Sequence, residues 1–286
     1  MGGKLRIGAV AYLNTRPLVF GLEQGLGGGR IELSYDVPAA LADRLERGEI
    51  DVGLIPTIEL AKIPGLEIVP GLGIVSRGPA RSVLLVSRGA PERARRVALD
   101  PESRTTNALT RILFDELWAT RPEFEIASLD LATALADHDA VVRIGDKALF
   151  DPMPDGAGSV DLGERWDRAT GLPFVYAAWA CRAGVLDGEL HDMLHESLRR
   201  GAAAIDLIAE DYAWNGRTHP DLAREYLTRN LRFRLGPAEM DGMTRFLASA
   251  ARLGIVAAPA RPRLGLVRRS AREAGVEARA EVESGA

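Results

Sequence analysis

The feature that most constrains the fold of this chain is the alternation of short apolar runs with amphipathic stretches in its N-terminal part. Strand patterns occur at Leu5–Val10 and at residues 31–37, and residues 50–55 have the pattern of a buried strand. Residues 38–47 form an amphipathic helix between the last two strands, with Pro38 at its start and a glycine after its end. Strand, helix and strand in this order predict a parallel α/β sheet, in which ligands bind beyond the carboxyl ends of the strands.

Two further apolar runs, at residues 66–75 and 82–87, precede a linker-like run at residues 88–96. The alternation then resumes. Strand patterns are found at residues 96–99, 124–129, 140–144 and 174–181, and helix patterns at 103–118, 132–136 and 161–169. From residue 187 onward the pattern is helical only, at residues 188–212, 221–229 and 238–252. The tail after Pro262 has few large apolar residues, which favours a loosely held helix or a disordered segment.

A length of 286 residues favours two lobes of ordinary domain size over one small core. We predict an α/β chain whose first lobe comprises residues 1–87 and 174–286 and whose second lobe comprises residues 88–173. Two chain crossings then form a hinge, and a ligand cleft lies between the lobes. Two sequential domains followed by a separate helical domain would show the same periodicity, so that alternative stays open.

Composition excludes several classes of partner. The apolar fraction of 47%, the charged fraction of 27% and the net charge of −4 are typical of a soluble globular protein without a basic field, so we expect neither nucleic acid nor membrane as partner. No run reaches the roughly 18 apolar residues of a membrane span, and no secretory signal pattern is visible, so we expect a cytoplasmic protein. An anionic ligand would have to be held by single arginines, backbone N–H groups or helix N-termini.

The start of the helix expected at residues 103–118 is one candidate site. Ser103, Thr105, Thr106 and Asn107 place three hydroxyls and an amide in one turn, next to the free N–H groups and the positive end of the helix dipole. Such a turn suits a carboxylate or phosphate. Plain N-capping needs only one Ser or Thr and is the alternative interpretation.

The loop that follows the first strand is a second candidate site. It carries Tyr12, Asn14 and Arg16, and an arginine can pair bidentately with a carboxylate. Thr57 lies at the corresponding end of a neighbouring strand. The alternative is that the loop only caps and turns into a short helix, with Arg16 facing water.

Three more positions follow or begin expected strands. Asp146, preceded by Gly145, can orient a substrate hydroxyl or accept a proton, or it can simply cap the next turn. Ser82 can reach the cleft or pack in the core.

No pattern calls for a metal or an organic cofactor. His191 and His195 are four apart on an expected helix, but no third ligand is suggested, and a helix surface explains them better. The single Cys181 excludes an internal disulfide and a thiolate metal cluster.

Several segments together resemble a known family, the chorismate dehydratases of the futalosine route of menaquinone biosynthesis. They are IGAVAYLNTRPL at residues 7–18, DVGLIPTIE at 51–59, SRTT at 103–106, IGD at 144–146 and TGLPFVYA at 170–177. The resemblance implies a type II periplasmic-binding-protein fold that has become a cytoplasmic enzyme. It also implies a hydro-lyase that removes water from chorismate, a dicarboxylate, to give 3-[(1-carboxyvinyl)oxy]benzoate without metal or cofactor.

The resemblance also suggests roles for the residues. Asn14 would orient the reacting ring and assist proton movement or hydroxyl departure, and the turn at Thr105 and Thr106 would bind one carboxylate. Ser82 and Arg16 would help at the other carboxylate. A carboxylate of the substrate can then act as the base, or Asp146 can do so from the protein, and the sequence does not decide between them.

Two other functions remain as alternatives. The first is a small-anion binding protein with the same fold and no chemistry. The second is the sister enzyme that acts on a substrate of the dehypoxanthine futalosine type, which the opening loop disfavours because the sister family begins differently.

Overall fold

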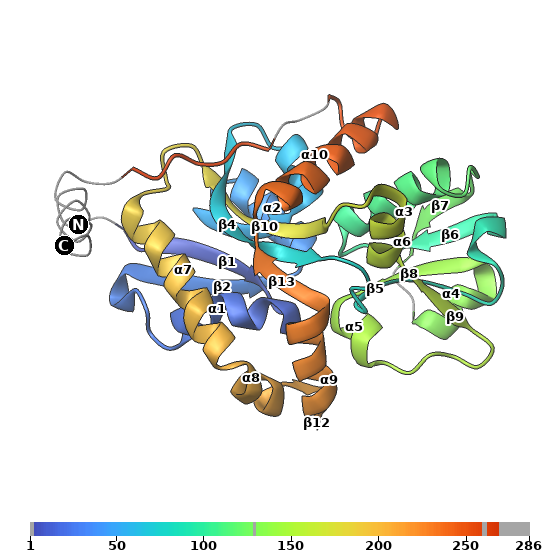
Figure 1. Ribbon diagram of the computed structural model, residues 1–286, viewed down its shortest axis with the longest axis horizontal. Coiled ribbons are helices and arrows are strands. Elements are labelled where there is room, and N and C mark those ends of the chain that lie inside the picture. The colour runs from blue at the N-terminus through green and yellow to red at the C-terminus, as the bar shows by residue number, and fades with distance from the viewer. Residues whose placement is uncertain (1–2, 128–129, 259–261, 269–286) are drawn as a thin grey trace, which may run out of the picture.

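Two β-sheets lie side by side along the long axis of the molecule (Figure 1). The computed structural model describes residues 3–127, 130–258 and 262–268. The first sheet has the strand order β13-β4-β10-β3-β1-β2. Its strands are β1 (Leu5–Val10), β2 (Ile31–Asp36), β3 (Val52–Pro56), β4 (Leu66–Ser76), β10 (Phe174–Arg182) and β13 (Leu231–Arg234). The strands β1, β2 and β3 are parallel, and β10 runs antiparallel to both β3 and β4.

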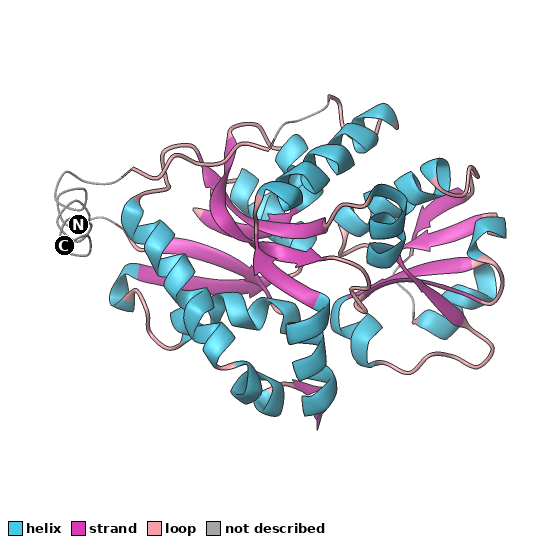
Figure 2. Cartoon of the chain, viewed as in Figure 1, coloured by secondary structure: helices cyan, strands magenta, loops and turns pink. Residues whose placement is uncertain are grey.

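Helices bury both faces of the first sheet (Figure 2). They are α1 (Arg16–Glu23), α2 (Pro38–Glu46), α7 (Gly188–Ala203), α8 (Ile205–Asp211), α9 (Pro220–Glu225) and α10 (Pro237–Arg252). Helices α1 and α7 share one apolar core with β1 and β3, and α2 packs on the opposite face. Glycines permit the close approach of α1 and α7, since a Cβ at Gly201 would lie 2.0 Å from the backbone oxygen of Pro17.

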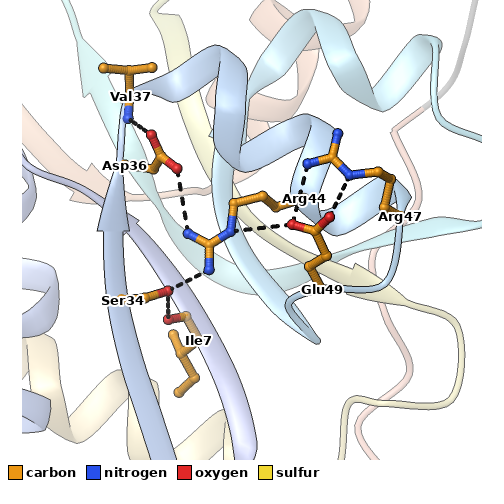
Figure 3. A network of polar contacts seen from close by, with 7 residues as sticks. All are labelled: Ile7, Ser34, Asp36, Val37, Arg44, Arg47 and Glu49. Carbon is orange, nitrogen blue, oxygen red and sulfur yellow. Dashed lines mark hydrogen bonds and ion pairs between the residues drawn. The ribbon is translucent and has the colours of Figure 1, made fainter.

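Helix α2 is also held by polar contacts on its outer side (Figure 3). Arg44 donates to the hydroxyl of Ser34 on β2 at 3.0 Å and lies 3.6 Å from the carboxylate of Asp36. Asp36 in turn accepts the backbone N–H of Val37 at 2.9 Å, directly before the helix begins. These contacts set the position of α2 against β2, and α2 carries Asp43, whose carboxylate accepts the guanidinium of Arg104 at 2.8 Å.

The second sheet has the order β7-β6-β8-β5-β9. Its strands are β5 (Val83–Ser87), β6 (Arg96–Leu99), β7 (Glu123–Ile126), β8 (Ala140–Ile144) and β9 (Gly158–Asp161). The helices of this part are α3 (Arg104–Glu116), α4 (Leu131–Asp137), α5 (Gly145–Phe150) and α6 (Leu162–Thr170). The chain therefore passes from the first sheet to the second after β4 and returns at β10, as the two-crossing architecture requires.

The strand pairing bears on the expected boundary between the two lobes. Strand β5 pairs with β8 and β9 of the second sheet, so the expected division at residue 87 falls one strand too late. We propose that the first crossing lies between β4 and β5. Helix α10 does not pack on the first sheet alone, because Arg245 and Arg252 form ion pairs with Glu116 at the end of α3.

The expectation of helices only after residue 187 is wrong. Strand β13 pairs antiparallel with β4, and β11 (Ala213–Trp214) with β12 (Arg217–Thr218) forms a small hairpin. A sheet edge at β4 needs a partner, and the four residues of β13 alternate buried and exposed as a strand should. The helix expected at residues 188–212 is divided between α7 and α8, and the short strand β9 was not expected.

Two other expectations fall partly outside the described residues. Residues 128–129, at the end of the expected strand 124–129, and most of the tail after Pro262 are not described. Within the tail, Leu264 forms a β-bridge with Ile68. Within the described residues, no helix combines the length and the apolar character that a membrane span needs.

Candidate functional site

A pocket opens between the two sheets where the strands β1, β3 and β8 end. Its empty volume is about 560 Å³, which includes space open to solvent. It is lined by Val10, Tyr12, Asn14, Pro38, Pro56, Ile74, Ser82, Val83, Ser103, Thr105, Thr106, Ile144, Gly145, Tyr176, Ala177 and Leu231. The residues come from both lobes, as a cleft between the carboxyl ends of the strands predicts.

Seven of the eleven residues expected at the site line this pocket. They are Tyr12, Asn14, Ser82, Ser103, Thr105, Thr106 and Gly145. The other four, Arg16, Thr57, Asn107 and Asp146, are not among its lining residues. The structure therefore brings together the two loops that the sequence pointed to, the one after β1 and the one before α3.

The turn at the start of α3 combines capping with exposure to the pocket. The Ser103 hydroxyl accepts the N–H of Thr106 at 3.3 Å and donates to the Thr106 hydroxyl at 2.8 Å. The hydroxyl of Thr105 accepts the N–H of Ile58 from the first lobe at 3.2 Å. Asn107 only ties down the preceding loop, because its amide exchanges hydrogen bonds with the backbone of Asp100.

Tyr12 spans the two lobes. Its hydroxyl donates to the carboxylate of Glu102 at 2.7 Å, and its ring packs on Gly145. Gly145 has a φ of +63°, and a Cβ there would lie 2.9 Å from the Tyr12 ring. Glycine is needed here both for the left-handed backbone and for the space that the ring occupies.

Asp146 lies behind the loop that carries Asn14. Its side chain is buried, and it accepts the N–H of Leu13 at 3.2 Å and the hydroxyl of Tyr212. Burial raises the pKa of Asp146 to about 6, and these two hydrogen bonds oppose the rise. The carboxylate thus joins the second lobe to the turn Leu13–Thr15 of the first lobe and does not face the pocket.

Arg16 and Thr57 have structural partners. Arg16 pairs with Glu23 at 2.8 Å within α1, away from the pocket. Thr57 is fully buried and donates to the carbonyl of Val175 at 2.7 Å, which ties β3 to β10.

The pocket lining contains no lysine or arginine. Two arginines near lining residues in the sequence have carboxylate partners: Arg16 pairs with Glu23, and Arg104 pairs with Asp43 of α2 at 2.8 Å. An anion in this pocket would therefore meet hydroxyls, amides and the N-terminus of α3. Among the residues that the structure describes, no group of three or more His, Cys, Asp or Glu side chains could hold a metal ion.

Sequence reasoning missed Tyr226. It is fully buried within a segment expected to be plain helix, and its hydroxyl donates to Ser82 of the pocket at 2.7 Å. A tyrosine in a helical pattern normally indicates core packing, and nothing in the local sequence shows that its hydroxyl reaches a strand 144 residues away.

Comparisons with known proteins agree with this arrangement. A family model described as menaquinone biosynthesis matches residues 5–252. A chorismate dehydratase of Thermus thermophilus is 32% identical over 272 residues, which cover 88% of this chain and 96% of that protein. A chorismate dehydratase of Campylobacter jejuni is 28% identical over 255 residues, which cover 87% of this chain and 98% of that protein.

A solved structure supports the fold. A Candida albicans protein described as having the generic periplasmic binding protein structural fold aligns with a TM-score of 0.65 at 14% identity, over 93% of this chain and 98% of that one. At this identity the likeness shows the fold alone. The periplasmic-binding-protein fold expected from the sequence is confirmed.

Proposed function

Because this chain belongs to the menaquinone biosynthesis family, we propose that it is a chorismate dehydratase, a hydro-lyase that converts chorismate to 3-[(1-carboxyvinyl)oxy]benzoate. One observation carries the proposal. All five segments that resemble that family come from different parts of the chain and contribute residues to the lining of one pocket.

The chemistry asks little of the protein beyond placement. Chorismate carries two carboxylates on a cyclohexadiene ring, and loss of the hydroxyl and a ring proton makes the ring aromatic. One C–H bond and one C–O bond break, and the proton and the hydroxyl leave as water. Oriented donors and exclusion of competing reactions can then account for most of the catalysis.

The pocket supplies donors for this task. We assign one substrate carboxylate to the N-terminal turn of α3, at Thr105 and Thr106, where backbone N–H groups and hydroxyls converge. Ser82 serves the second carboxylate, and Asn14 orients the reacting ring and assists departure of the hydroxyl. Tyr12 and Gly145 form the pocket wall.

Asp146 has a structural role in this proposal. It does not line the pocket and already accepts two hydrogen bonds, so we assign proton removal to a substrate carboxylate. Asp146 holds the turn that carries Asn14. No metal or organic cofactor enters the proposed reaction, and we place the enzyme in the cytoplasm, in the futalosine route to menaquinone.

A direct assay tests the proposal. Purified protein is incubated with chorismate, and formation of the aromatic product is followed by absorbance and mass. Tight binding of chorismate without product would instead support a non-catalytic binding protein, a candidate that the fold favours. Turnover of a dehypoxanthine futalosine-type substrate with no turnover of chorismate would support the sister enzyme.

A further inference from the structure

A buried tyrosine stands behind the polar wall of the pocket. Tyr226 begins a single π-helical turn (Tyr226–Asn230) between α9 and β13, and the next residue, Leu231, lines the pocket. The π-helical turns are rare and often lie at functional sites. The ring of Tyr226 is 1% exposed and packs in the core of the first lobe, so its hydroxyl has no access to bulk water.

The hydroxyl of Tyr226 contacts a pocket residue that directly precedes β5 of the second sheet. It donates to Oγ of Ser82 at 2.7 Å, and Ser82 is itself only 2% exposed. Burial, the largest influence, raises the pKa of Tyr226, so the phenol keeps its proton and remains a donor.

The direction of these bonds determines what the pocket offers a ligand. A hydroxyl has one hydrogen, and that of Tyr226 is used on Ser82. The oxygen of Ser82 accepts this hydrogen with one lone pair, and the hydrogen of Ser82 itself points away from Tyr226. Because Ser82 lines the pocket, that hydrogen is available to the ligand.

Asn14 also lines the pocket. Its amide oxygen accepts the hydroxyl of Thr15 at 3.3 Å, so the amide nitrogen is the donor end of this side chain. An amide nitrogen carries two hydrogens that it can donate to a ligand. Both residues then present donors to a ligand in a pocket that has no cationic side chain.

We infer that Tyr226 is a positioning residue: by its bond to Ser82 it turns that hydroxyl into a donor for the anionic substrate, beside the amide of Asn14. This inference rests on the proposed function, because it assumes that the ligand is an anion whose negative charge these donors meet. Such fixed donors cost no reorganisation during the reaction.

The test is a double-mutant cycle of Tyr226→Phe and Ser82→Ala, measured as kcat and KM for chorismate. Tyr226→Phe removes one oxygen and keeps the packed ring, and we expect a loss of about ten- to hundredfold in kcat/KM. If the phenol acts through Ser82, the double variant should lose much less than the product of the two single losses. Two matched controls, Tyr35→Phe and Ser87→Ala, remove the same groups outside the pocket and should keep wild-type kinetics.

The outcomes separate the inference from the proposed function. Suppose that the wild-type protein converts chorismate. An unchanged kcat/KM in Tyr226→Phe, or fully multiplicative losses in the double variant, would then overturn the role of Tyr226 and leave the proposed function intact. A wild-type protein that neither converts nor binds chorismate would overturn the proposed function and this inference with it. A loss in Tyr226→Phe that is matched by Tyr35→Phe would show a general effect of tyrosine removal and would also overturn the inference.

Discussion

Replacement of Gly145 by alanine tests how the pocket wall is built. Gly145 has a φ of +63°, and a Cβ would lie 2.9 to 3.1 Å from three atoms of the Tyr12 ring. An L-residue in this backbone region costs about 1–2 kcal/mol. The ring must also move, and loss of its 2.7 Å bond to the carboxylate of Glu102 adds about 1.5–3 kcal/mol.

We therefore expect Gly145→Ala to lower the free energy of unfolding by about 2.5–5 kcal/mol. The matched control is Gly171→Ala, because Gly171 has a φ of +68° but a Cβ there would meet no atom within 4 Å. The control should lose only the backbone part, about 1–2 kcal/mol. Both are measured by urea denaturation, with the change in slope checked to confirm two-state behaviour.

The loss of activity should also be larger in Gly145→Ala than in Gly171→Ala. A displaced Tyr12 ring changes the pocket wall, and a shift of about 1 Å at such a site can cost about a hundredfold in rate. Gly171→Ala, at the C-terminal end of α6, should keep wild-type kcat and KM. Equal destabilisation of the two variants, or full activity in Gly145→Ala, would refute the packing of Tyr12 on Gly145.

Two further predictions concern the loop after β1. Asn14→Ala should abolish most turnover of chorismate while the unfolding free energy changes by less than about 1 kcal/mol, and full turnover in that variant would refute the role of Asn14. Because the pKa of Asp146 is raised from 3.8 to about 6, the folded protein binds more protons between these values, and stability should fall by on the order of 3 kcal/mol as pH rises through them. Urea denaturation at several pH values should show that this slope is lost in Asp146→Asn, and a slope that persists would contradict the assignment.

The local sequence was enough for those elements whose signal lies within the element itself. The strands Leu5–Val10, Arg96–Leu99 and Ala140–Ile144 have the bounds expected from their apolar runs. Helix α3 begins at its predicted cap, Ser103. Strand ends and caps are local features. Because ligands of α/β sheets bind at strand ends, the sequence placed Asn14 and Thr105 at the cleft, and both line the same pocket.

The tertiary structure decided what depends on distant partners. Strand β13 forms because the edge of β4 accepts it, although its four residues carry too short a pattern to outweigh the helices around it. For Asp146 the sequence left open a role toward the substrate or in capping the next turn; its carboxylate accepts the N–H of Leu13, 133 residues earlier, and does not line the pocket. Tyr226 reaches Ser82 across 144 residues. The sequence by itself thus determined which loops meet at the cleft. Only the packing of the two lobes decided which side chains in those loops face the ligand, because their orientation depends on hydrogen bonds between residues far apart in the chain.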